Sequence, residues 1–133
     1  MALHGLSVMT ISLPRLVVLL VEDEPIVRFD AIQSFEDAGF EVVEAYDGAE
    51  ALVALNARPD VSAVFTDVHM PGPLNGVALA KLIHERRPEV RVLVTSGVMR
   101  VEKDDLPEGA HFIPKPYDAL QVAEFIRSLE KSA

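Results

Sequence analysis

The sequence contains no cysteine and no hydrophobic run long enough to cross a bilayer. Without cysteine the chain has no disulfide framework, no thiolate metal site and no cysteine nucleophile. Its longest strongly apolar run, LVVLLV at 16–21, is far too short to span a membrane, and the acidic letters EDE follow it directly. We therefore expect no signal peptide, no membrane insertion and a cytoplasmic protein.

Basic residues are scarce as well. The chain has 12 Lys and Arg against 21 Asp and Glu, and its formal net charge is -9. Such a surface repels DNA, RNA and anionic lipid, so we expect no direct contact with nucleic acid. It is compatible with an acidic pocket for a divalent cation, and it weakly favours a monomer or a weak dimer. The length of 133 residues fits one domain.

Short apolar segments alternate with helical patterns about five times along the chain. The apolar segments lie at 16–21, 40–45, 61–66, 90–95 and 111–113. The rhythm predicts parallel strands joined by right-handed crossovers. The expected fold is α/β, a doubly wound sheet of five parallel strands with helices on both faces. Residues 97–110 are polar and predict a short helix at most.

Capping residues and proline mark where the helices begin. Pro25 suits a first helical position, and Asp47 and Asn75 suit N-caps. After Pro25, apolar residues recur at helical spacing; they are Ile26, Phe29, Ile32 and Phe35. Residues 1–14 show no clear period, so we expect a loose N-terminal extension before a domain at 15–133.

Polar side chains follow the central strands, where function sits in a doubly wound sheet. In chain order they are Glu22, Asp23, Glu24, Asp67, Thr95, Ser96 and Lys115. Carboxylates this close repel one another and favour a bound cation, and an all-oxygen ligand set suits Mg²⁺ better than Zn²⁺. With an ammonium group and a hydroxyl added, the set forms a clamp for a phosphoryl group. Asp67 is then the natural nucleophile, since a carboxylate can hold a phosphoryl group as an acyl phosphate.

Four stretches carry a resemblance to a known family. They are VVLLVEDEP, AVFTDVHMPG, VLVTSG and FIPKP, in that order. The sequence resembles the receiver domain of response regulators in bacterial two-component signalling over roughly residues 15–130. The resemblance implies a flavodoxin-like receiver fold, and a subfamily with a short or irregular fourth helix matches the polar segment best.

The resemblance also implies roles for residues of this chain. Asp67 would be the phosphoacceptor. Asp23 would bind Mg²⁺ directly, Glu22 would assist, and the backbone carbonyl of His69 would be a further ligand.

Other implied roles concern the phosphoryl group and the switch. Thr95 would donate to a phosphoryl oxygen, although Ser96 is an alternative. Lys115 would pair with the phosphoryl group and precede a cis proline. Phe112 would be the switch aromatic.

The expected function is that of a stand-alone response regulator. A sensor histidine kinase or a phosphotransfer protein would phosphorylate it, and it would act on a downstream protein target or pass the phosphoryl group onward. It would not be an enzyme in the usual sense, but would assist its own phosphorylation and autodephosphorylation. The main alternative is a degenerate receiver that binds partners without phosphorylation. An aspartyl phosphatase and a flavin- or nucleotide-binding module are weaker alternatives, because His69 replaces a second aspartate and EDEP replaces a phosphate-cradling loop.

Overall fold

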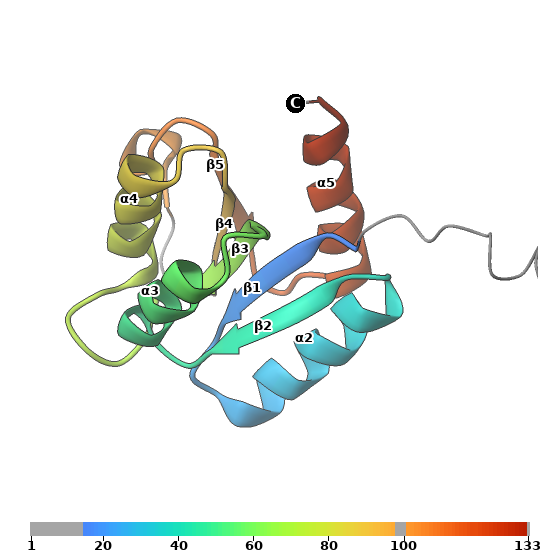
Figure 1. Ribbon diagram of the computed structural model, residues 1–133. Helices are drawn as coiled ribbons and strands as arrows, with labels where there is room; N and C mark the ends of the chain where they lie inside the picture. Colours follow the sequence, from blue (N-terminus) through green and yellow to red (C-terminus); the bar gives the residue numbers. More distant parts are fainter. Residues whose placement is uncertain (1–14, 98–100, 133) are drawn as a thin grey trace, which may run out of the picture.

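The computed structural model describes residues 15–97 and 101–132, so the predicted extension at 1–14 lies outside the described residues. One parallel sheet has the strand order β2-β1-β3-β4-β5 (Figure 1). Its strands are β1 (Val17–Val21), β2 (Glu41–Ala45), β3 (Val61–Asp67), β4 (Arg91–Ser96) and β5 (Ala110–Pro114). The predicted doubly wound, flavodoxin-like fold is confirmed.

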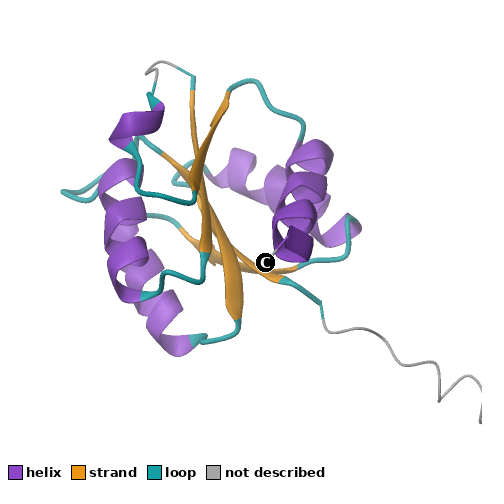
Figure 2. Ribbon diagram, turned by 90° about the horizontal axis from the view of Figure 1, so that it is seen from above, coloured by secondary structure: helices purple, strands orange, loops and turns teal. Residues whose placement is uncertain are grey.

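Helices cover both faces of the sheet (Figure 2). They are α2 (Pro25–Asp37), α3 (Gly48–Ala57), α4 (Gly76–Arg86) and α5 (Ala119–Ser132). Buried residues of α3 and α4 share one hydrophobic cluster, and those of α2 and α5 share another. The sheet therefore separates two cores. No helix within the described ranges is long and apolar enough to cross a membrane.

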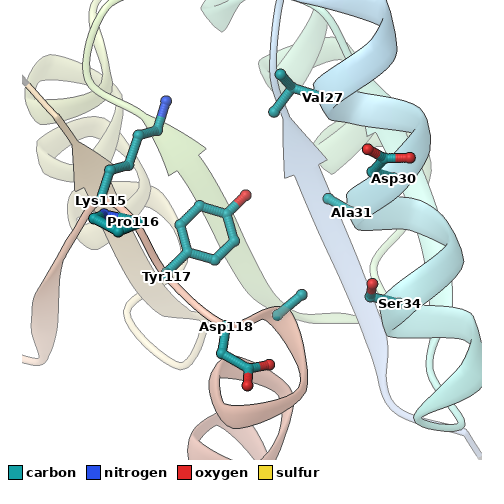
Figure 3. A pocket seen from close by; sticks show the side chains of 9 residues that line it. Val27, Asp30, Ala31, Ser34, Lys115, Pro116, Tyr117 and Asp118 are labelled. Atoms are coloured by element: carbon teal, nitrogen blue, oxygen red, sulfur yellow. The ribbon is translucent and has the colours of Figure 1, made fainter.

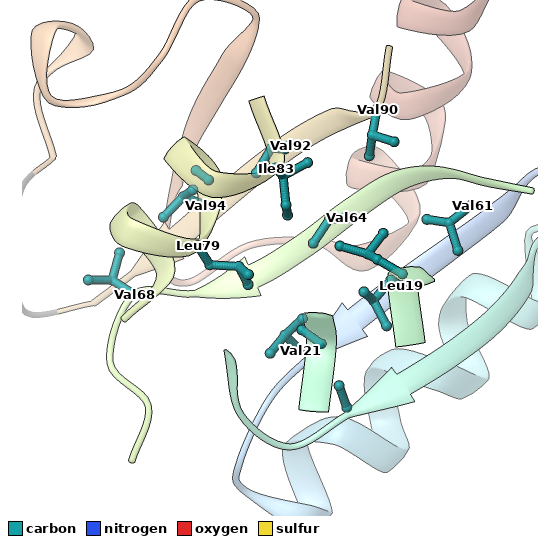
Figure 4. Close-up of a cluster of buried hydrophobic side chains, with 14 of the residues drawn as sticks. Leu19, Val21, Val61, Val64, Val68, Leu79, Ile83, Val90, Val92 and Val94 are labelled. Atoms are coloured by element: carbon teal, nitrogen blue, oxygen red, sulfur yellow. The ribbon is translucent and has the colours of Figure 1, made fainter. Parts of the chain in front are cut away.

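Strand β1 lies between β2 and β3 in the sheet and contributes to both cores. Leu19 and Val21 pack in the cluster with α3 and α4 (Figure 4), whereas Val18 and Leu20 pack in the cluster with α2 and α5. Successive strand side chains point to opposite faces, so a strand covered on both sides must be apolar throughout. This explains the continuous apolar run at 16–21 and fixes where the acidic residues after it emerge.

Helix α2 forms as predicted, but its apolar residues do not form one buried face. Phe35 is buried, whereas Ile26 and Phe29 are 77% and 62% exposed. A spacing of three residues falls short of the 3.6 residues of a helical turn, so the set drifts around the helix. Ile26 and Phe35, nine residues apart, consequently lie on opposite sides of α2.

The predicted N-caps of α3 and α4 are confirmed, because the side chain of each capping residue accepts a hydrogen bond from the first turn of its helix. The amide of Glu50 donates to Asp47 (2.8 Å), and the amide of Ala78 donates to Asn75 (2.9 Å). Between β4 and β5, the described residues hold one turn of 3-10 helix, η1 (Lys103–Asp105), which agrees with the expected short fourth helix. Part of that segment, residues 98–100, lies outside the described residues.

Arg87 ties together three segments at the amino-terminal edge of the sheet. Its guanidinium donates to the carbonyl oxygens of Leu55, Arg58, Pro59 and Val61 at 2.8–3.2 Å. We predict that Arg87→Met lowers the free energy of unfolding by about 2 kcal/mol, because hydrogen bonds from a charged donor are lost.

Urea unfolding followed by circular dichroism measures this loss. Glu89→Gln is the matched control, since it removes only the exposed ion pair of Arg87 with Glu89 (3.3 Å) and should change stability by less than about 1 kcal/mol. Equal effects of the two substitutions would contradict the role given to the carbonyl contacts.

His111 in β5 predicts a pH dependence of stability. Its ring packs edge-on against Phe125 (5.1 Å between centroids), and burial, followed by the charge of Arg91, lowers its pKa. The folded protein thus binds this proton more weakly than the unfolded chain, whose histidine pKa is about 6.5. Stability should fall as pH decreases through and below that value. His111→Gln should show less of this fall, which urea midpoints at pH 8 and pH 5 would measure; parallel curves would count against it.

Candidate functional site at the carboxyl edge of the sheet

The carboxyl ends of four strands bring the predicted site residues together. Glu22 follows β1, and Asp67 is the last residue of β3. Thr95 is the second-to-last residue of β4, and Lys115 follows β5. Asp67 and Thr95 are direct neighbours in the register of β3 and β4. The expectation that the central strands deliver polar groups to one edge is therefore correct.

A close ion pair links Asp67 and Lys115. Lys115 Nζ lies 2.8 Å from Asp67 Oδ2, and the Asp67 side chain is only 9% exposed. Partial burial by itself lowers the pKa of Lys115, but the hydrogen bond to Asp67 and the charges of Asp67 and Glu22 outweigh it and raise that pKa. The ammonium group therefore stays charged at neutral pH. The Lys115–Pro116 peptide is cis, as expected.

Glu22 adds a second buried carboxylate beside this pair. Burial is the main cause that raises the pKa of Glu22, and the charge of Asp67 raises it further, while the amide of Glu24, which donates to Glu22 Oε2 at 2.9 Å, opposes the rise. Asp23, half-buried, lies next to it, and its carboxyl group raises the pKa of Glu22 further. The carboxylates of Glu22, Asp23 and Asp67 thus carry more negative charge than the ammonium group of Lys115 can balance. Such an environment favours a divalent cation.

The donor set fits Mg²⁺ rather than a metal held by side chains alone. Within the described ranges, no three His, Cys, Asp or Glu side chains are arranged to hold a metal ion by themselves. A cation here would need main-chain oxygen and water as further ligands, and Mg²⁺ commonly keeps several waters. The structure brings the His69 peptide to this place, since the His69 amide approaches Asp67 Oδ1 at 3.3 Å.

Thr95 carries a buried hydroxyl without a partner. The residue is 3% exposed, and Thr95 Oγ1 makes no hydrogen bond. Ser96, the alternative, is equally buried but already engaged in an interaction. An unpaired buried hydroxyl beside Asp67 is suited to bind a group that arrives there. Phe112 lies half-buried against the core cluster under α4, in register with Val94, and its switch role remains a prediction.

A groove beside Lys115 was not predicted from the sequence. It has a volume of about 700 Å³ and runs between α2 and the segment after β5. Figure 3 shows Val27 and Asp30 of α2 on one side, and Lys115 and Tyr117 on the other. The Tyr117 ring packs edge-on against Phe65 of β3 (5.0 Å between centroids). The aromatic residue two positions after Lys115 was the only sequence signal, and it does not reveal a groove.

Gly76 begins α4 directly against the backbone of Asp67. A β-carbon at this position would lie 2.3 Å from Asp67 O and 2.9 Å from Val68 Cα. We predict that Gly76→Ala displaces the end of β3, lowers the free energy of unfolding by about 3 kcal/mol and slows any reaction of Asp67.

Urea unfolding measures the effect of Gly76→Ala. Gly97→Ala is a suitable control, because a β-carbon there would make an ordinary contact of 3.5 Å with Lys115. Wild-type stability of the Gly76 variant would show that the backbone relaxes without cost.

The fold and the site together define the class of this protein. A parallel sheet in this order, with an aspartate–lysine pair and an acidic turn at its carboxyl edge, is a flavodoxin-like α/β signalling domain. Residues 18–127 match the response regulator receiver domain, and the chain belongs to that family. Receiver domains are phosphoacceptor domains of two-component systems that interact with histidine kinases or phosphotransfer proteins and generally use Mg²⁺.

Individual relatives are bacterial proteins of different lengths. The chain is 32% identical over 116 residues to the sensor kinase CckA of Brucella abortus, covering 84% of this chain and 12% of that kinase. It is 28% identical to the response regulator receiver protein CpdR of the same organism, covering 86% of this chain and 93% of CpdR. The chain covers 47% of the aerobic respiration control protein ArcA of Escherichia coli, to which it is 33% identical, and 22% of the transcriptional regulator NtrC of the same organism. A response regulator receiver protein from Sinorhizobium medicae has a TM-score of 0.82 at 26% identity, covering 91% of this chain and 98% of that one.

Proposed function

We propose that this domain accepts a phosphoryl group on Asp67 from a sensor histidine kinase or a phosphotransfer protein. The observation that carries the proposal is the 2.8 Å pair of Lys115 with Asp67 at the carboxyl edge of the sheet. An Asp67 oxygen attacks phosphorus, a P–O bond forms, and the P–N bond of the phosphohistidine breaks. Its electron pair leaves with the imidazole, which takes up a proton.

Each neighbouring residue has a role in this reaction. Lys115 balances charge on the phosphoryl oxygens, and the unpaired hydroxyl of Thr95 donates a hydrogen bond to one of them. Glu22, Asp23 and Asp67, together with the His69 carbonyl, would hold Mg²⁺, which when bound neutralises charge on the phosphoryl group. The same groups would assist the later hydrolysis of the acyl phosphate.

The donor would approach over the groove beside Lys115. The groove is continuous with the site through Lys115; Val27, an exposed apolar residue of α2, lines it, and the exposed Ile26 precedes Val27 in the first turn of the helix. A folded partner that carries the phosphohistidine on a helix would cover these side chains. Protein contact of this kind, and no contact with nucleic acid, is what the net charge of -9 favours.

The output would be a change in protein contacts. When Thr95 moves toward the phosphoryl group, Phe112 would turn into the space that opens, and the face near β5 and α5 would bind a downstream target or pass on the phosphoryl group. Similarity to CpdR, which the chain covers over 93% of its length, supports a stand-alone regulator. It would work in the cytoplasm as a monomer or weak dimer, a state that the net charge of -9 weakly favours.

The test uses a small phosphodonor, so that no kinase needs to be known. The protein is incubated with phosphoramidate or acetyl phosphate, with and without Mg²⁺, and its intact mass is recorded. We expect a gain of one phosphoryl group that requires Mg²⁺, and borohydride reduction followed by peptide mapping should place it on Asp67. No gain under any condition would overturn the proposal in favour of a degenerate receiver that binds partners without phosphorylation.

A further inference from the structure

Arg28 folds back from the first turn of α2 over the acidic turn that precedes the helix. Its Nη1 donates to the main-chain carbonyl oxygen of Glu22 at 2.7 Å, and its Nε donates to Glu44 Oε1 of β2 at 3.2 Å. The Arg28 side chain is only 20% exposed. An arginine fork with two separate acceptors is a fixed link rather than a free surface charge.

The contacts fasten the peptide of Glu22 at both of its polar groups. The Glu22 amide donates to the Ala45 carbonyl at the end of β2 (3.0 Å), and the Glu22 carbonyl accepts from Arg28. Because Glu44, the residue before Ala45, holds the other arm of Arg28, the acidic turn is tied twice to the end of β2. The bond to Arg28 uses the main-chain oxygen, so the carboxylates of Glu22 and Asp23 stay available for a cation.

We propose that Arg28 is a positioning residue that holds the acidic turn in the geometry that binds Mg²⁺. This inference rests on the proposed function, which assigns the metal to Glu22, Asp23 and Asp67. Arg28 does not touch the metal and acts through the Glu22 peptide. Residues that orient metal ligands typically change metal affinity by about 10–100-fold when they are lost.

If only the charge of Arg28 mattered, removing it would change the Mg²⁺ affinity in the opposite direction. A guanidinium group near the site repels a divalent cation, so its removal should tighten Mg²⁺ binding if Arg28 acts only as a charge. If Arg28 acts by position, its removal weakens binding in spite of the lost repulsion. Arg28→Met removes both properties, whereas Arg28→Lys keeps the charge and loses the fork.

Isothermal titration calorimetry with MgCl₂ measures the affinity directly in the unphosphorylated protein. We expect Arg28→Met to weaken Mg²⁺ binding by about tenfold or more, and Arg28→Lys to fall between it and the wild type. Glu44→Gln removes the charge that anchors Arg28 and should weaken binding slightly. Arg58→Met is the matched control: Arg58 also pairs with a carboxylate of β2, Glu41 (2.6 Å), but near the start of that strand, and its loss should leave the affinity unchanged.

Phosphorylation by phosphoramidate gives a second readout. The Mg²⁺ concentration for half-maximal rate should rise in Arg28→Met, while the rate at saturating Mg²⁺ should stay near that of the wild type, because the reacting groups are intact. Circular dichroism checks that each variant is folded, and Arg28→Lys decides the question if Arg28→Met unfolds.

Two different failures are distinguishable. Unchanged or tighter Mg²⁺ binding in the folded Arg28 variants, with a wild type that binds Mg²⁺ and is phosphorylated, overturns the positioning role alone. A wild type that binds no Mg²⁺ overturns this inference together with the metal site of the proposed function.

Discussion

Asp67→Asn should abolish phosphorylation of the protein by small phosphodonors, a loss of more than about 1000-fold. The asparagine amide has nearly the shape of the carboxylate, but it is neutral, is a poor nucleophile and does not form an acyl phosphate. The substitution should leave the fold intact, because Asp67 ends β3 and its backbone bonds remain. Stability should hold or rise, since the charge of Asp67 contributes to the raised pKa of Glu22 and this repulsion is relieved.

The measurement is intact mass after incubation with phosphoramidate and Mg²⁺, with a urea titration of the same samples. Asp60→Asn is the matched control, because Asp60 is an exposed aspartate that pairs with Arg58 at 2.9 Å, just before the start of β3. It should be phosphorylated like the wild type. A phosphoryl gain in Asp67→Asn that maps to another residue would show that Asp67 is not the acceptor.

The fold was predictable because the buried strands appear in the sequence as short apolar runs. Buried on both faces, β1 is apolar at every position, and the charged letters resume as soon as the strand leaves the sheet. Local caps such as Asp47 and Asn75 then fix where helices begin. What the spacing did not predict is which side of α2 is buried, because packing against α5 decides this and a three-residue repeat does not follow one face.

The proximity of the candidate site residues was predictable from the sequence, but their individual contacts were not. Parallel strands end at one edge, so Glu22, Asp67, Thr95 and Lys115 had to lie near one another. The link from Arg28 to the Glu22 carbonyl crosses from a helix to the turn before it and on to β2, and no local pattern specifies such a bond. Long side chains reach partners that only the assembled fold brings into range.

Lys115→Met should slow phosphorylation of Asp67 by about 100–1000-fold at saturating Mg²⁺. The variant loses the ammonium group that lies 2.8 Å from Asp67 and would balance charge as the phosphoryl group transfers. Because the pKa of Lys115 is raised, the wild-type rate should not fall between pH 7 and pH 9 through loss of this charge. The rate is measured by quenched mass spectrometry with phosphoramidate.

Lys81→Met, on the exposed side of α4, is the control and should react at the wild-type rate. Mg²⁺ affinity separates two explanations for a slow Lys115 variant. Removing a nearby cation should leave Mg²⁺ binding equal or tighter. Slow phosphorylation with intact metal binding therefore assigns the defect to the phosphoryl group, whereas weakened metal binding would mean that Lys115 mainly maintains the arrangement of the carboxylates.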